Sequence, residues 1–133
     1  MKIVVDANIF ISSFFWGGSP RRIVERIIAG KDVLFITKEI LDEIGDVIRR
    51  PKFHASENEI HYFMNSIEEL GNRITAKNKI ENVSIDEDDN KYIECGIAAS
   101  VDYIISGDKH LLEIEEYENI KIIDARKYLE IVE

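Results

Sequence analysis

The stretch that decides the fold is KIVVDAN, at residues 2–8. Three β-branched residues run together there and end at an Asp-Ala-Asn break, which is typical of a short strand that is buried on both faces. Other short strands are expected at 33–36, 73–75, 103–106 and 120–123. Because such strands alternate with helical segments, the sequence predicts an α/β fold, a single three-layer α/β/α domain with a central parallel sheet of about five strands.

The expected helices are marked by capping residues and by the spacing of apolar residues. Thr37 caps a helix that must end before Pro51, and Ser56 with Glu59 forms a capping box at the start of the next one. The polar residues 76–84 indicate a loop. Helices are expected at 19–30, 37–48, 56–70, 86–100 and 111–114, with a last one from residue 124.

The length and composition favour one domain over residues 1–133. The chain is 45% hydrophobic and 32% charged, which is an ordinary globular mixture. No basic start is followed by an apolar run, and no stretch approaches the ~20 apolar residues that span a bilayer. The single cysteine, Cys95, cannot form an intramolecular disulfide. We therefore expect a soluble, cytoplasmic protein without a membrane partner.

The net charge argues against a polyanionic partner, because 17 Lys and Arg oppose 26 Asp and Glu and leave the chain at −9. The distribution of charge tempers this conclusion, since basic clusters stand at 21–22 and 49–52. A solvated surface explains these residues equally well. The candidates for phosphate contacts are Arg21, Arg22, Arg49, Arg50, Lys52 and Lys109.

Two acids, Asp6 and Asp108, follow expected strands directly. Ligands of open parallel sheets bind beyond the carboxyl ends of the strands, so both side chains are candidates for a site at that edge. Either acid alone is explained as well by turn formation or by capping of the helix that follows.

Two further acids stand out on expected helices. Glu43 borders the apolar face of its helix, whereas the neighbouring acids lie farther round the helix. Asp89 shares a face with Ile93 and Gly96, and the glycine would let that face pack close to a strand. The alternatives are a surface ion pair for Glu43 and a place in a helix-capping acidic run for Asp89.

A cluster of Asp6, Glu43, Asp89 and Asp108 would need a cation, because carboxylates held within a few ångströms repel each other. Oxygen ligands of this kind suit Mg²⁺ or Mn²⁺, with one or two ions in the site. Such ions activate water and polarise phosphodiesters. The sequence therefore predicts metal-dependent phosphodiester hydrolysis by these four residues.

The chain resembles the PIN-domain ribonucleases, and within them the VapC-like toxin components of prokaryotic toxin-antitoxin pairs. The ordered set of matching segments covers nearly the whole chain. The segments are VVDAN at 4–8, FWGGSPRR at 15–22, ILDEI at 40–44, RRPKF at 49–53, DEDDNK at 86–91 and DYIISGDKHLL at 102–112.

This resemblance implies an endoribonuclease that cuts RNA by metal-activated water and leaves 5′-phosphate and 3′-hydroxyl ends. It places the four acids in the metal site and gives Asn8 and Ser106 supporting roles beside it, although turn hydrogen bonds would also explain both. It further implies an antitoxin protein as partner and assembly into a homodimer or higher oligomer. The aromatic residues 14–16 then offer base stacking or a dimer contact, against the more frequent role of core packing.

One position departs from the family pattern. Many relatives carry a further acid shortly after the position of Asp108, whereas this chain has Lys109 and His110. That difference puts firm binding of a second metal ion in doubt. The three histidines, His54, His61 and His110, lack metal-site spacing, and we assign them no role.

Three other classes of protein stay open. An aspartyl-phosphate phosphatase needs a second acid two residues after its nucleophile, and Asn8 stands there. A receiver-like phospho-Asp signalling domain needs an acidic pair at the first strand end and an acceptor Asp on the central strand, and neither is visible. The third alternative is a catalytically silent PIN-fold module that binds proteins.

Overall fold

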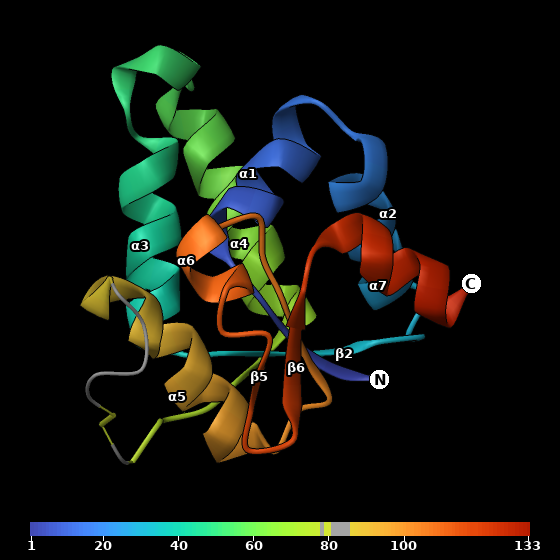
Figure 1. Ribbon diagram of the computed structural model, residues 1–133. Coiled ribbons are helices and arrows are strands. Elements are labelled where there is room, and N and C mark those ends of the chain that lie inside the picture. The colour runs from blue at the N-terminus through green and yellow to red at the C-terminus, as the bar shows by residue number, and fades with distance from the viewer. Residues whose placement is uncertain (78, 81–85) are drawn as a thin grey trace.

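The computed structural model describes residues 1–77, 79–80 and 86–133. Within these residues, six strands form one sheet in the order β3-β2-β1-β4-β6-β5 (Figure 1). Their bounds are Lys2–Val5 (β1), Val33–Ile36 (β2), Gly71–Arg73 (β3), Tyr103–Ile105 (β4), Glu116–Tyr117 (β5) and Ile120–Ile123 (β6). β1 is central, as its buried β-branched sequence predicts.

The sheet is parallel except at one edge. β1 pairs in parallel with β2 and β4, and β3 and β6 extend the sheet on the two sides. β5 pairs antiparallel with β6, and the sequence did not predict it. The turn between them holds Glu118 and Asn119 at φ 48° and 70°, which is a left-handed turn that a search for apolar runs does not detect. The predicted α/β/α architecture is confirmed, with this short hairpin added.

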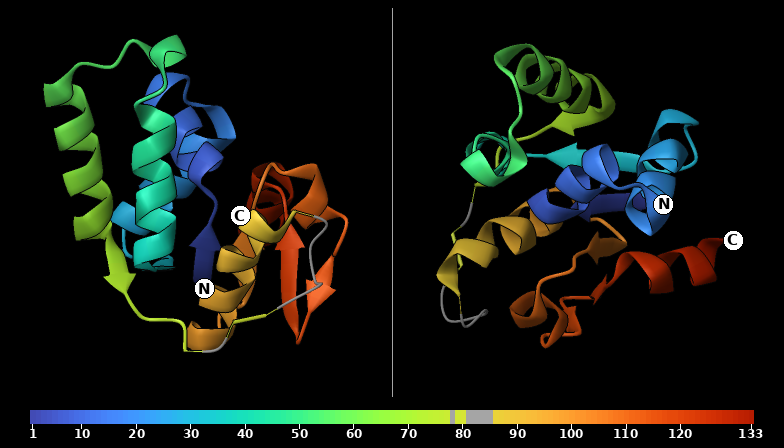
Figure 2. Two further views of the ribbon diagram at one scale, coloured as in Figure 1. Left: turned by 90° about the vertical axis from the view of Figure 1, so that its left-hand side faces the viewer. Right: turned by 90° about the horizontal axis from the view of Figure 1, so that it is seen from above.

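Helices flank the sheet on both sides. The bounds are Ala7–Phe15 (α1), Gly18–Ile28 (α2), Lys38–Ile48 (α3), Glu57–Leu70 (α4), Asn90–Ala99 (α5), Lys109–Leu112 (α6) and Ala125–Val132 (α7), with short 3-10 turns at Pro51–Phe53 (η1) and Glu87–Asp89 (η2). Figure 2 shows α3 and α4 on one side of the sheet and α5 on the other. Among the described residues, no helix is both long enough and apolar enough to cross a membrane.

Most predicted elements appear within about two residues of their expected ends. The predicted helix at 86–100 divides into η2 and α5, and the predicted strand at 73–75 begins and ends two residues earlier, as β3. The predicted loop at 76–84 has no helix or strand at 76–77 and 79–80, and its remaining residues lie outside the described part.

The largest difference from the predictions is α1, which the sequence analysis did not expect. Its residues are apolar on most sides, so the polar face that marks an amphipathic helix is missing. Asp6 starts this helix, because its side chain accepts a hydrogen bond from the Ile9 N–H (3.1 Å). The break that ended the predicted strand is therefore a helix cap.

Close packing holds α5 against the sheet. A Cβ atom at Gly96 would lie 3.2 Å from both Ile104 Cδ1 and Val101 Cγ2, so a larger residue would require these side chains to shift. This agrees with the predicted role of the glycine. The buried Cys95 belongs to the same helix. The contact sets the position of α5, and with it the position of Asp89 at its start.

Candidate metal centre

Asp6 lies between β1 and α1, at the carboxyl end of the central strand. Its Oδ1 atom accepts the Ile9 N–H, and its Oδ2 atom accepts hydrogen bonds from the Ser106 hydroxyl and the Gly107 N–H (3.2 Å). The side chain is buried. Burial raises the pKa of Asp6 above its ordinary value despite these hydrogen bonds, and the charge of Asp108 raises it further.

Asp89 lies at the junction of η2 and α5 and is only 7% exposed. Its Oδ2 atom is buried and has no hydrogen-bond partner among the described residues. Burial is the main cause that raises the pKa of Asp89 to about 7, and the carboxylates of Asp108, Asp86, Glu43 and Asp6 raise it as well. A buried carboxylate oxygen without a partner is costly, so this atom is well placed for a ligand.

Glu43 lies in the middle of α3 with its carboxylate toward α5. Its Oε2 atom accepts a hydrogen bond from the Tyr92 hydroxyl (2.8 Å) and forms an ion pair with Lys91 Nζ (2.8 Å). The Tyr92 hydroxyl also accepts the Ala7 N–H (3.1 Å). Burial, and then the charge of Glu43, raise the pKa of Tyr92, so the hydroxyl keeps its proton and orients Glu43 as a donor.

Asp108 follows β4 and caps α6, where its Oδ1 atom accepts the His110 N–H (2.7 Å). Its own N–H donates to Ser106 Oγ (2.9 Å). Ser106 therefore connects Asp108 to Asp6, because its hydroxyl donates to the Asp6 carboxylate. Ser106 is buried, whereas Asn8 is exposed on the first turn of α1, and the supporting roles that the family resemblance implies for both stay predictions.

The structure brings the four predicted acids to one end of the sheet. In Figure 1, α3 and the start of α5 lie side by side there, in agreement with the ion pair between Glu43 and Lys91. The charges of the other three acids each raise the pKa of Asp89, as expected when carboxylates lie close together. The site offers carboxylate oxygens, which suit a hard divalent cation such as Mg²⁺ or Mn²⁺, and one of them is buried without a partner among the described residues. Within the described part of the chain, Asp89 alone of the four acids belongs to a group of three possible ligands whose atoms lie within 4.8 Å of one another.

The basic residues predicted to bind phosphate are scattered. Lys109 is exposed beside the site, at the first position of α6. Arg22 pairs with a glutamate at the end of the chain, and Arg21 and Arg49 each donate to a main-chain carbonyl group. Lys52 lies over an aromatic ring of η1, 5.1 Å from its centroid.

Four residues at this site escaped the sequence analysis. Lys91 and Tyr92 contact Glu43, and Asp86 and His110 lie beside Asp89. One atom each of Asp86, Asp89 and His110 lies within 4.8 Å of the others. Histidine spacing alone could not reveal this, because His110 is far from the other two in sequence. Its position two residues after Asp108 was the available signal.

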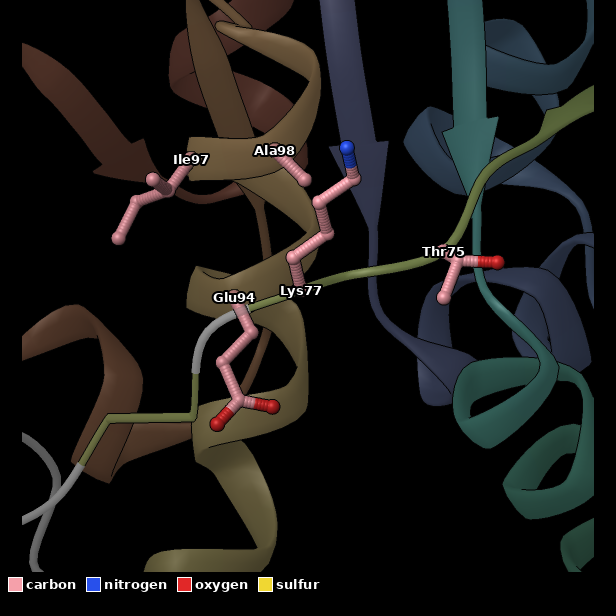
Figure 3. A pocket seen from close by; sticks show the side chains of 5 residues that line it. All are labelled: Thr75, Lys77, Glu94, Ile97 and Ala98. Carbon is pink, nitrogen blue, oxygen red and sulfur yellow. The ribbon is translucent and has the colours of Figure 1, made fainter.

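A separate pocket lies beside the C-terminal half of α5 (Figure 3). In Figure 3 the Lys77 amine points away from the Glu94 carboxylate. Glu94 Oε2 accepts the Ile80 N–H (2.9 Å), so its charge is already used to hold the chain segment beside it. No polar groups converge among the described residues that line this pocket. Its lining residues are Thr75, Lys77, Glu94, Ile97 and Ala98.

The sequence matches the PIN domain family over residues 2–110, and the chain therefore belongs to this family. Among solved structures, it is similar to a chain of the crystal structure of VapBC2 from Rickettsia felis bound to a DNA fragment from their promoter. The TM-score is 0.65 over 92% of this chain and 97% of that chain, and 12% of the residues are identical. At this identity the likeness shows a shared fold. No curated protein matches the sequence.

Proposed function

We propose that this protein is a metal-dependent endoribonuclease that hydrolyses RNA phosphodiester bonds. The observation that carries the proposal is Asp89 Oδ2, a buried carboxylate oxygen that has no partner in the described structure and lies in a cluster of acids. Membership of the PIN family, whose members are typically nucleases, supports the same conclusion. The residues that would hold one or two Mg²⁺ or Mn²⁺ ions are Asp6, Glu43, Asp89 and Asp108.

When bound, such a cation activates water as a nucleophile and offsets the negative charge that develops on the phosphate. The protein's part is to hold the carboxylates in place. Ser106 positions Asp6 through its hydroxyl, and Tyr92 positions Glu43. Lys91, 2.8 Å from Glu43, adds a positive charge at the rim of the cluster that a phosphate can approach.

The substrate we propose is single-stranded RNA. Trp16 is 70% exposed, and its ring centroid lies 6.2 Å from that of Phe53. Lys52 Nζ lies over the same Phe53 ring. Aromatic side chains beside basic ones bind single strands by stacking bases and pairing with phosphates. Phosphate contacts by Arg21, Arg22, Arg49, Lys52 and Lys109 are part of the proposal.

We also propose that the chain is the toxin of a toxin-antitoxin pair and assembles as a homodimer or higher oligomer. The likeness in fold to a chain of the VapBC2 structure supports a protein partner of the antitoxin type. A neighbouring reading frame that encodes a small DNA-binding protein would strengthen this part of the proposal. Co-expression followed by size-exclusion chromatography would test the complex directly.

The test of the nuclease compares wild type with Asp6→Asn and Asp89→Asn on a mixed RNA substrate, in Mn²⁺ or in EDTA. The matched control is Asp42→Asn, an exposed acid one residue before Glu43 that pairs with Lys38. We expect cleavage by wild type and the control in Mn²⁺, with 5′-phosphate ends, and none in EDTA. Equal cleavage by all samples would contradict the proposal. Metal binding without cleavage would favour the silent binding module.

A further inference from the structure

We propose that Asp86, Asp89 and His110 form a second cation site, selective for transition metal ions such as Zn²⁺ over Mg²⁺. Asp86 directly precedes the 3-10 turn η2 and Asp89 is the last residue of that turn, whereas His110 comes from α6. One ligand atom of each lies within 4.8 Å of the other two. Asp86 and His110 are outside the set of four acids, so this site differs from the proposed Mg²⁺ or Mn²⁺ centre.

The second observation is the state of Asp89. Its side chain is more than nine-tenths buried, and its Oδ2 atom has no hydrogen-bond partner among the described residues. Buried polar atoms in folded proteins are almost always paired, so an orphaned carboxylate oxygen calls for a positive partner. A cation held between η2 and α6 would provide it.

The surrounding charges favour a cation at this place. Asp108 Oδ1 lies 3.9 Å from His110 Nδ1, which keeps the potential around the ring negative. The lysine closest in sequence to Asp89, Lys91, is paired with Glu43. His110 is 42% exposed at its side chain, so an ion can reach the ring from solvent.

The histidine nitrogen determines which ions fit. Mg²⁺ prefers an all-oxygen octahedral shell, whereas imidazole nitrogen is a good ligand for Zn²⁺, Ni²⁺ and Cu²⁺. Zn²⁺ also accepts carboxylate oxygens beside imidazole nitrogen, and three protein ligands leave a fourth position for water. We therefore expect affinity to rise from Mg²⁺ through Mn²⁺ to Zn²⁺.

Binding of Zn²⁺ at this site would affect the proposed enzyme through Asp89. Asp89 belongs both to this site and to the proposed Mg²⁺ or Mn²⁺ centre, so Zn²⁺ held by His110 would compete for its carboxylate. This effect of Zn²⁺ on the enzyme rests on the proposed nuclease function, whereas the binding of Zn²⁺ does not. Zinc would then inhibit cleavage supported by Mg²⁺ or Mn²⁺.

The test is calorimetric titration of the metal-free protein with Zn²⁺ and, separately, with Mg²⁺. We expect His110→Asn to weaken Zn²⁺ binding by about tenfold or more, and to change Mg²⁺ binding by less than about threefold. The control is His54→Asn, an exposed histidine in the left-handed conformation that asparagine readily adopts, and it should bind Zn²⁺ like wild type. Circular dichroism verifies that each variant is folded.

A second variant keeps the test decisive. His110→Asp replaces the nitrogen by an oxygen ligand and should shift the preference from Zn²⁺ toward Mg²⁺. Absence of saturable Zn²⁺ binding to wild type, or equal Zn²⁺ affinity in wild type and His110→Asn, would overturn the proposal. RNA cleavage in Mg²⁺ is measured separately on wild type, so loss of the zinc site and loss of the nuclease function give different results.

Discussion

Two buried aspartates, Asp32 and Asp89, differ in their hydrogen bonding and in the direction of their pKa shifts. Asp32 is hydrogen bonded to Arg26 Nε (2.8 Å) and to the Tyr128 hydroxyl (2.6 Å), and the N-terminal amine lies 3.5 Å away. Burial alone would raise the pKa of Asp32, but these partners lower it below its ordinary value. Asp89 lies among other carboxylates with one oxygen that has no partner within the described residues, and its pKa rises to about 7. A satisfied carboxylate stabilises the fold, while an unsatisfied one is available for a ligand.

The largest expected effect is the loss of stability in Asp32→Asn. The substitution removes the nearer charge partner of Arg26, which is only 12% exposed at its side chain, and leaves this residue with Glu133 at 3.9 Å. We expect the free energy of unfolding to fall by about 3–5 kcal/mol, as measured by urea denaturation. RNA cleavage per folded molecule should be unchanged. A loss below about 1 kcal/mol would show that this network contributes little.

Asp89→Asn should raise the stability of the protein and lower its rate of RNA cleavage. Removing a repelled charge should raise the free energy of unfolding of the metal-free protein by about 1–3 kcal/mol, since one pKa unit corresponds to about 1.4 kcal/mol. Cleavage should fall at least 100-fold, or about 3 kcal/mol of transition-state stabilisation. Both are measured on the same preparation, with Asp42→Asn as control. A destabilised but fully active variant would refute the contrast.

The two aspartates should also give opposite pH dependences to the metal-free protein. Between about pH 4 and 7 the unfolded chain releases the Asp89 proton while the folded chain keeps it, so stability falls as pH rises. Because folding lowers the pKa of Asp32, the Asp32 carboxylate stabilises the folded state at pH values above its ordinary pKa of 3.8. This stabilisation is lost as the pH falls below that value.

Urea denaturation at pH 4.5 and 7.5 checks this sign. Wild type should lose stability between the two values, and Asp89→Asn should lose less. Mn²⁺ should restore part of the loss at pH 7.5, because it binds the charged carboxylates of the folded state. An identical pH profile for wild type and Asp89→Asn would rule out Asp89 as the source.

The smallest expected effect belongs to Tyr92→Phe. Loss of the hydroxyl leaves Glu43 and the Ala7 N–H without one partner each and should cost about 1–2 kcal/mol of stability. Cleavage should fall about tenfold through kcat, with KM nearly constant, because Tyr92 positions a carboxylate. Tyr62→Phe, at an exposed tyrosine of α4, is the control. Equal kcat in Tyr92→Phe and wild type would remove the positioning role.

Much of the site followed from local patterns. Asp6 and Asp108 were found because they end apolar strands, and Glu43 because it borders an apolar helical face. Asp89 was separated from the adjacent acids by its place on the face that contains Gly96. Their role as metal ligands stays a prediction, and the structure shows that the charges of Asp6, Glu43 and Asp108 act on Asp89.

Other features had no local signal. Helix α1 lacks a polar face, and β5 is two residues long. The partners of Glu43 lie on another helix, and His110 reaches Asp86 and Asp89 only through the fold. No pattern near Asp32 indicated that Tyr128, 96 residues away in the chain, would complete its hydrogen bonding.

The sequence by itself determined the order of most strands and helices and the strand and helix ends at which acids stand, because hydrophobic periodicity and capping are properties of neighbouring residues. It also determined the membership of the PIN family. Only the tertiary structure decided which carboxylates are satisfied. Asp6 meets Ser106 across 100 residues of chain, while Asp89 Oδ2 meets no partner in the described structure. Desolvation and charge repulsion act through space, so the difference between a structural acid and a ligand-ready one appears only after folding.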